Sequence, residues 1–294
     1  MPQHFASHRW KNLRIKYELE SGIAWYYMQS GERPSFTLEL LREISIFQSK
    51  VKELSSKNNR FPKTLYTVLA SDSPGVFNFG GDLALFARCI LARDRDGLEN
   101  YAKACIDVLY NNAVNLESPV TTISLVQGQA LGGGFEAALS SEVVIAERGV
   151  KLGFPEIMFN LFPGMGAFHL LSERVSHVTA KRMIQGGDLY TAEDLYEVGL
   201  VDILAARGEG EKAVMEYIRR HRRSWNGYMH IQKVTAFERA FNYQDLMNAA
   251  NIWVDAAMGI SEKDVRKMEK LVSAQRRAFV DQGDVKQQAV AQTS

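Results

Sequence analysis

The chain has 294 residues, of which 46% are apolar and 23% are charged, a composition typical of folded globular proteins and unlike that of disordered or fibrous ones. At about 150 residues per domain, this length allows one large domain or two smaller ones. Lys and Arg number 35 against 34 Asp and Glu, so the net charge of +1 provides no overall field to attract a nucleic acid or an anionic membrane. We expect neither as a partner.

The sequence has no feature of an exported or membrane-spanning chain. Its first residues, MPQHFASHRW, contain no apolar core of a signal peptide, and no run of 18 apolar residues occurs. We therefore expect a cytoplasmic protein. The cysteines, Cys89 and Cys105, are too few for a disulfide framework or a four-ligand zinc site, and we expect both to be buried. His169 and His177 lack a Cys or Asp at ligand spacing, so we expect structural roles for them and no metal or cofactor.

The first predicted elements are two strands and a helix. Residues 13–19 alternate between apolar and polar, the pattern of a half-buried strand, and the apolar run at 23–28 predicts a second strand. A short connection containing Gly22 joins the two, which predicts a hairpin. After Pro34, apolar residues recur at helical spacing and predict an amphipathic helix over 36–54.

The next part of the chain alternates strands and helices. Short β-branched runs at 65–71 and 120–128 end in turn residues, and the segment between them has a helical pattern. This alternation predicts an α/β fold. Residues 209–294 show no strand pattern and predict successive helices, with a polar tail from Gln282. We expect an α/β core over residues 1–208, followed by a helical C-terminal extension.

Two glycine-rich stretches each follow a predicted strand. The first is FNFGGD at 77–82 and the second is ALGGGFE at 130–136. Glycines at the start of a helix let a ligand approach the backbone, where free N–H groups stabilise an anion. The spacings of a dinucleotide fingerprint and of a phosphate-binding P-loop are both absent. From these residues alone, glycines that serve only tight packing explain the two loops equally well.

Two glutamates lie close to these glycines. Glu136 falls in the first turn of the predicted helix after the triple glycine, where the helix dipole favours its ionised form. Glu156 follows Gly153-Phe154-Pro155 and precedes an apolar run. Either one alone is typical of a helix cap or a surface residue. Together, beside anion-binding glycines, they suggest acid–base catalysis.

A set of motifs in a fixed order resembles the crotonase (enoyl-CoA hydratase/isomerase) superfamily. The motifs are FNFGGDL at 77–83, ALGGGFEAAL at 130–139, GFPEI at 153–157, PGMGAFHLL at 163–171, and the segment from Gly186-Gly187 to Val201. Within that superfamily, the N-terminal hairpin, the aromatic loop at 77–83 and the C-terminal region resemble the diffusible signal factor synthases of bacterial quorum sensing. The resemblance implies an α/β spiral of ββα units with a helical C-terminal extension that trimerises and closes the acyl pocket.

The resemblance also implies roles for particular residues. The N–H groups of Gly81 and Gly133 would form an oxyanion hole over a thioester carbonyl, and Glu136 and Glu156 would be the catalytic carboxylates. Further residues would bind the substrate, namely Phe79, Gly80, Met165, Trp253 and Leu271, with Phe162 a weaker candidate. From the sequence alone, the apolar members of this set are equally well explained as ordinary core side chains.

The implied substrate is an acyl thioester of acyl carrier protein or of CoA. Because acyl carrier proteins are acidic, the basic run Arg219, Arg220, Arg222 and Arg223 is a candidate docking site, although a solvated helix end explains it as well. The resemblance further implies a homotrimer or hexamer. It brings in no cofactor.

Three functions remain open from the sequence. The first is a bifunctional 3-hydroxyacyl dehydratase and thioesterase that makes a cis-2-unsaturated fatty acid signal. The second is a conventional enoyl-CoA hydratase or isomerase, and the third is a catalytically silent homologue that binds a partner such as a sensor kinase. Two intact glutamates argue against silence. A serine-nucleophile site is disfavoured, because Ser124 lies in a predicted strand and no G-x-S-x-G elbow occurs.

Overall fold

The computed structural model describes residues 5, 8–29, 33–55 and 65–275, so the predicted polar tail lies outside the described residues. The chain enters the fold through β1 (Leu13–Glu18) and β2 (Ile23–Met28), which pair in antiparallel fashion with Leu13 opposite Met28. The predicted hairpin is therefore confirmed. Helix α2 (Leu38–Ser55) follows and confirms the amphipathic helix.

The larger of two sheets has six strands in the order β1-β2-β3-β5-β7-β10. Its strands from β2 to β10 run parallel, and those after the hairpin are β3 (Tyr66–Ser71), β5 (Thr121–Val126), β7 (Val143–Glu147) and β10 (Ile203–Ala205). The strands predicted at 65–71 and 120–128 are thus confirmed. Their β-branched runs are buried on both faces, as parallel strands covered by helices require.

The smaller sheet contains short strands that the sequence analysis missed. Its order is β4 (Val76–Asn78), β6 (Gln129–Leu131), β8 (Lys151–Gly153) and β9 (Leu189–Thr191). A strand of three residues is too short to show an alternating pattern, so the segment between β3 and β5, predicted as helical, hides β4. The rest of that segment is helical, in α3 (Leu83–Ala92) and α4 (Arg95–Ala113).

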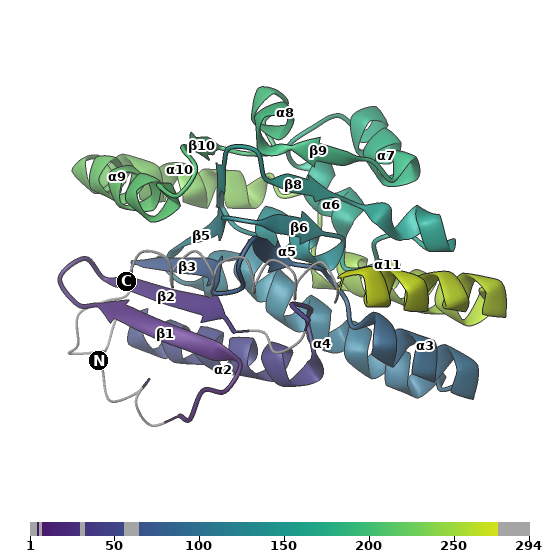
Figure 1. The fold of residues 1–294 in the computed structure, drawn as a ribbon. Helices are drawn as coiled ribbons and strands as arrows, with labels where there is room; N and C mark the ends of the chain where they lie inside the picture. Colours follow the sequence, from purple (N-terminus) through teal and green to yellow (C-terminus); the bar gives the residue numbers. More distant parts are fainter. Residues whose placement is uncertain (1–4, 6–7, 30–32, 56–64, 276–294) are drawn as a thin grey trace, which may run out of the picture.

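Three successive units repeat the same path through the two sheets. In each unit one strand joins the larger sheet, the next joins the smaller sheet, and a helix follows: β3-β4-α3, β5-β6-α5 and β7-β8-η2 (Figure 1). The helical segments α5 (Gly133–Leu139) and η2 (Pro155–Phe159) follow β6 and β8 directly. The expected α/β spiral of ββα units is confirmed. Because β4, β6 and β8 are parallel neighbours, the segments that follow them begin at the same edge of the smaller sheet.

The remaining described elements are helical apart from the short strands already given. They are η1 (Asn115–Glu117), α6 (Ala167–Ser172), α7 (His177–Gly186), α8 (Ala192–Glu197), α9 (Gly210–Arg223), α10 (Trp225–Phe237), α11 (Tyr243–Gly259) and a helix over 262–275. Helices therefore follow residue 209 as predicted, and α11 packs on α4. None of the helices in the described ranges combines the length and apolar character needed to cross a lipid bilayer.

Two apolar clusters form most of the core. The larger contains both cysteines, confirming their predicted burial, and receives Trp253 and Val254 from α11. The second lies on the other face of the larger sheet, where Val214 of α9 joins the strand residues. The C-terminal helices thus cover parts of both clusters.

Candidate active site

The two glycine loops meet backbone to backbone at the edge of the smaller sheet. Gly80 has a positive φ of 88°, and its N–H donates to Oδ1 of Asn78 at 2.7 Å. A Cβ at Gly80 would lie 2.7 Å from the carbonyl oxygen of Leu131 and 2.8 Å from the nitrogen of Gly133. Any side chain here would force the loops apart, so glycine is required by both conformation and space.

This contact brings the two predicted oxyanion-hole residues together. A Cβ built on Gly133 would lie 3.4 Å from the nitrogen of Gly81, and both residues line the same cavity. Among the described residues, no oxygen accepts a hydrogen bond from either amide. Both N–H groups therefore remain available to a ligand's oxygen.

Neighbouring segments hold the first loop in place. The N–H of Phe36 donates to the carbonyl of Gly80 at 2.8 Å, and the Tyr101 hydroxyl donates to the carbonyl of Phe36 at 2.6 Å. The same hydroxyl accepts from the N–H of Asp82 at 3.0 Å, while the Asp82 side chain caps α3 by accepting from Leu85. These bonds fix the backbone on both sides of Gly81.

Glu136 projects from α5 and is only 1% exposed. Its Oε1 accepts hydrogen bonds from the backbone N–H groups of Met165 at 2.8 Å and Ala167 at 2.9 Å. Burial raises the pKa of Glu136 to about 7, although these two bonds favour the ionised form. The helix dipole was expected to favour the ionised form of Glu136, but its pKa is raised because of burial. The helix has only seven residues, and desolvation outweighs its dipole.

Glu156 projects from η2 toward the second glycine loop. A Cβ on Gly132 would overlap Oε1 of Glu156, so this glycine leaves room for the carboxylate. The other oxygen, Oε2, is buried and has no hydrogen-bond partner among the residues that the structure describes. Burial, reinforced by the nearby carboxylate of Glu136, raises the pKa of Glu156 to about 8. Near neutral pH the pair therefore holds at least one proton, which belongs to both groups together.

A cavity of about 620 Å³, counted out to its mouth, joins these features. We call it the outer cavity. The predicted site residues that line it are Phe79, Gly81, Gly133, Glu136, Glu156, Phe162, Met165, Trp253 and Leu271. Gly80 lies behind this wall and acts through the loop contact. Apart from the carboxylates and the glycine backbone the lining is largely apolar, which suits a chain of methylene groups.

Sequence reasoning missed several residues of the outer cavity. Phe86 of α3, Tyr101 and Cys105 of α4, and Gln275 of the last described helix also line it. Each falls on an amphipathic helix, where nothing distinguishes a cavity wall from the ordinary core. Only the backbone contacts of Tyr101 reveal that it also positions a glycine loop.

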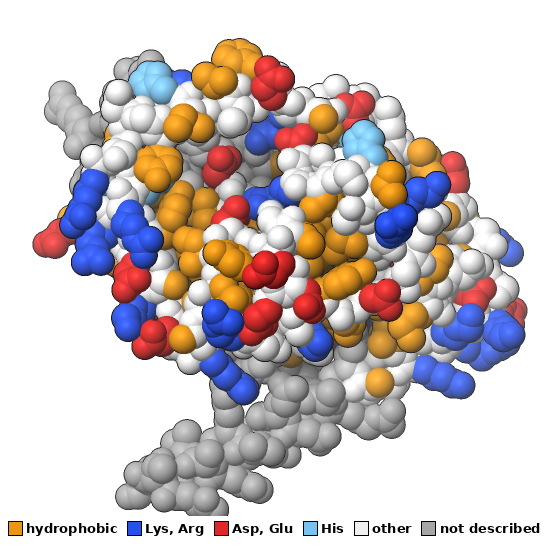
Figure 2. All heavy atoms as spheres, turned by 90° about the horizontal axis from the view of Figure 1, so that it is seen from above, with side chains coloured by type: hydrophobic (Ala, Val, Ile, Leu, Met, Phe, Trp, Pro, Cys, Tyr) orange, Lys and Arg blue, Asp and Glu red, His pale blue; other side chains and the backbone are white. Residues whose placement is uncertain are grey.

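Other sequence candidates lie elsewhere. The four arginines at the end of α9 are exposed, and Figure 1 shows α9 on the opposite side of the molecule from α3 and α11, two of the helices lining the outer cavity. Figure 2 shows Lys and Arg interspersed with Asp and Glu, in keeping with the balanced composition. Ser124 lies in β5 as predicted, and its hydroxyl bonds to that of Ser141 at 2.7 Å.

The fold defines a class of protein, the crotonase-like α/β spiral. An enoyl-CoA hydratase structure from Bacillus halodurans superposes with a TM-score of 0.75, covering 88% of this chain and 100% of that one at 16% identity. The structure of Pseudomonas aeruginosa DspI has a TM-score of 0.68, with 79% and 84% coverage and 23% identity. The sequence model of the enoyl-CoA hydratase/isomerase family matches residues 51–281, and the chain belongs to this family.

Curated relatives match a shorter part of the chain. Human mitochondrial methylglutaconyl-CoA hydratase is 28% identical over 175 residues, which is 58% of this chain and 49% of that protein. The rat protein of the same name is 29% identical over 147 residues, or 50% and 44% of the two chains. This chain thus matches about half the length of these relatives or less.

Proposed function

We propose that this chain is a diffusible signal factor synthase, which removes water from a 3-hydroxyacyl thioester and then hydrolyses the thioester to release a cis-2-unsaturated fatty acid. One observation carries the proposal: two carboxylates with raised pKa values line a largely apolar cavity together with two glycine N–H groups that donate to no described residue. The sequence motifs that resemble signal factor synthases support this proposal. The family to which the chain belongs supports the dehydration step alone.

In the first half-reaction the thioester carbonyl oxygen accepts from the N–H groups of Gly81 and Gly133. Negative charge on that oxygen grows as the α-carbon loses its proton, and each such donor is typically worth about 3–4 kcal/mol to the transition state. Of the two glutamates, the ionised one takes the α-proton, and the protonated one gives a proton to the departing hydroxyl group, which leaves as water. The raised pKa values supply these opposite protonation states near neutral pH.

In the second half-reaction water attacks the same carbonyl carbon. A glutamate carboxylate takes a proton from this water, and the glycine N–H groups stabilise the tetrahedral oxyanion. The carbon–sulfur bond then breaks, and the carrier thiol leaves with a proton. The products are a free unsaturated acid and the unacylated carrier.

The substrate's acyl chain lies against Met165, Trp253 and Leu271 in this proposal. These three side chains come from separate parts of the sequence and line the outer cavity together. The carrier is acyl carrier protein or CoA, and the assembly is a homotrimer or a hexamer. The arginines of α9 lie away from the helices that line the outer cavity, which argues against their predicted role in docking the carrier.

Product analysis tests the proposed function. Purified protein is incubated with a 3-hydroxyacyl group carried on acyl carrier protein and, separately, on CoA, and the products are identified by mass spectrometry. The proposal predicts a free cis-2-unsaturated acid, whose formation Glu136→Gln should slow by about 10²–10⁴-fold. Interconversion of hydroxyacyl and enoyl thioesters without release of free acid would identify a conventional enoyl-CoA hydratase, the second candidate that family membership favours.

A further inference from the structure

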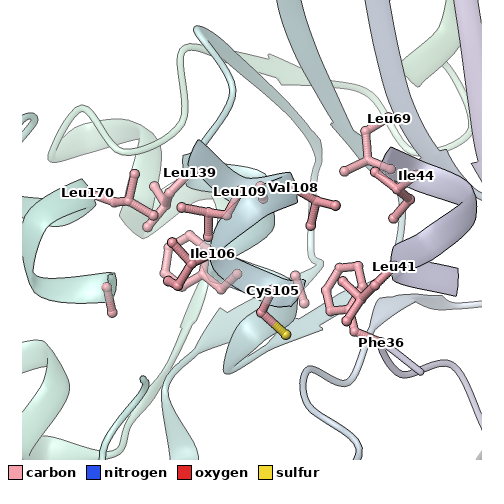
Figure 3. Close-up of a cluster of buried hydrophobic side chains, with 14 of the residues drawn as sticks. Phe36, Leu41, Ile44, Leu69, Cys105, Ile106, Val108, Leu109, Leu139 and Leu170 are labelled. Carbon is pink, nitrogen blue, oxygen red and sulfur yellow. The ribbon is translucent and has the colours of Figure 1, made fainter. Parts of the chain in front are cut away.

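A second cavity, which we call the inner cavity, lies directly behind the wall of the first. Its volume is about 380 Å³ counted out to its openings, and Cys105, Gly133 and Met165 line both cavities. Figure 3 shows Cys105 and Val108 of α4 facing Leu41 on α2 across part of this region. Gly133 of the oxyanion hole and the Met165 side chain therefore form part of the partition between the two cavities.

The partition between the two cavities contains a side chain suited to movement. Met165 is unbranched, and its Cε lies close to Gly133, at 2.7 Å from where a Cβ of that glycine would be. A methionine changes rotamer at little cost and fills gaps of different shapes. Its backbone N–H, not its side chain, bonds to Glu136, so the side chain can turn aside without releasing that carboxylate.

Among the described residues that line the inner cavity, Gln48 has a buried polar atom without a hydrogen-bond partner. Gln48 of α2 is 4% exposed, and its Nε2 donates to the carbonyl of Val108 at 2.8 Å, which fixes the orientation of the amide. Its Oε1 is buried and accepts no hydrogen bond from any described residue. By contrast, the Nδ2 group of Asn112 donates to Ser140 and Ser141, both at 3.0 Å.

We propose that the inner cavity is a binding site for the far end of an acyl chain that carries a hydroxyl group, which donates its hydrogen bond to Oε1 of Gln48. This rests on the proposed function in one respect, that the thioester end lies at Gly81 and Gly133. The chain passes Met165 once that side chain has turned aside.

The chemistry of the lining selects this class of ligand. Ile44, Leu69 and Leu109 offer apolar surface to the methylene groups. A methyl end placed against Gln48 would exclude water from Oε1 and leave a buried acceptor unpaired, whereas a hydroxyl group satisfies it. The site therefore favours a hydroxylated tail over a plain one of equal length.

The chain offers a matched control for this proposal. Gln275 is also a buried glutamine whose Oε1 has no partner among the described residues, but it lines the outer cavity instead. Gln48→Leu and Gln275→Leu therefore make the same chemical change in the two cavities. Comparing the affinities of the two variants for the same ligands shows in which cavity the end of the acyl chain lies.

The experiment measures the affinity of unreactive thioethers of pantetheine, the part common to CoA and acyl carrier protein, by calorimetry. Each saturated chain is made with a methyl end and with a hydroxyl end. The wild-type protein should bind the hydroxylated chain about five- to tenfold more tightly, the usual worth of one hydrogen bond. Gln48→Leu should remove this preference, and Gln275→Leu should keep it.

Opposite results overturn the proposal. A wild-type protein without a preference contradicts it, as does a preference that Gln275→Leu removes and Gln48→Leu keeps. Should Gln48→Leu fail to fold, Met165→Ala provides the second test, because it widens the partition between the cavities. This variant should bind the hydroxylated chain several-fold more tightly than the wild-type protein does, and its gain in affinity for the plain chain should be smaller. Because binding is measured without turnover, failure here leaves the proposed reaction intact, and that reaction fails only if no free acid forms.

Discussion

Glu136 and Glu156 line one cavity from two differently built segments. Glu136 leaves the first turn of α5 and is tied by two backbone N–H groups from the turn at Met165 and Ala167. Glu156 leaves the short helical segment η2, and its Oε2 has no partner among the described residues. One carboxylate is fixed by the fold, and the other has an oxygen open to a ligand.

This difference shows how one cavity can hold two acids in different states. The N–H groups on Glu136 favour its ionised form, so its pKa, about 7, stays below that of Glu156, about 8, although both are buried. The charge of Glu136 in turn raises the pKa of Glu156. The two backbone N–H groups on Glu136 and the effect of its charge on the Glu156 carboxyl therefore act in the same direction and separate the two pKa values.

The largest expected effect comes from removing either carboxylate. Glu136→Gln and Glu156→Gln keep the side-chain volume but cannot exchange a proton near neutral pH. Each should lower kcat for dehydration of a 3-hydroxyacyl thioester by about 10²–10⁴-fold, the usual loss for acid–base catalysis. Glu173→Gln is the control, since Glu173 also accepts a backbone hydrogen bond, from Ala240 at 2.7 Å, but lies outside the outer cavity. An equal loss of kcat in the control would show that the substitutions disturb folding and not catalysis.

Displacing Glu156 without changing it should have the next largest effect. In Gly132→Ala the new methyl group overlaps the Glu156 carboxylate, and a misplaced catalytic group loses about 10²-fold in rate. Gly149→Ala is the control, because Gly149 also has a positive φ but has nothing within 4 Å of a Cβ. Steady-state kinetics of both variants separate backbone strain from displacement. Equal rates would show that the position of Glu156 is unimportant.

The pH dependence sharpens the comparison between the two carboxylates. Since dehydration needs one protonated and one ionised group, kcat/KM should rise as pH passes about 7 and fall as it passes about 8. In Glu136→Gln the charge that raises the pKa of Glu156 is gone, so the remaining carboxyl should titrate below about 8. Titration of ¹³C-labelled glutamate side chains by NMR measures this shift. An unchanged midpoint would show that the two groups do not interact.

Local patterns predicted the fold where elements were long enough to show them. The hairpin of β1 and β2 and helix α2 were predicted within a few residues, because alternation and helical spacing are visible over six or more residues. The strands of the smaller sheet have three residues each and were missed. Their pairing depends on contacts between distant segments, which no local pattern contains.

In the candidate site, too, some features were predicted from local sequence and others were not. Sequence motifs identified the glycines and both glutamates, because these residues are short-range neighbours in recognisable loops. The ionisation of Glu136 was misjudged, since burial by the segment at Met165 to Ala167 depends on the tertiary fold. The inner cavity was missed entirely, because Gln48 and Cys105 come from helices distant in sequence.

The apolar wall should give the smallest effect. Leu271→Ala removes part of the outer cavity lining, and each methylene discriminated in such a pocket is worth about 1–3 kcal/mol. The spectrum of acyl groups released should broaden toward branched and bulkier chains without an absolute switch, as measured by mass spectrometry. Leu91→Ala is the control, because Leu91 is 58% exposed and lies outside the outer cavity. An unchanged spectrum in folded Leu271→Ala would remove this residue from the site.

The most direct test of the account is whether the two glutamates act as one unit. A double-mutant cycle with Glu136→Gln, Glu156→Gln and the double variant compares kcat for dehydration of the same 3-hydroxyacyl thioester. Groups that act together in one step lose most of their effect with the first substitution. The account predicts a loss in the double variant far below the product of the two single losses. A loss equal to that product, or near-normal rates in both single variants, would contradict the paired mechanism.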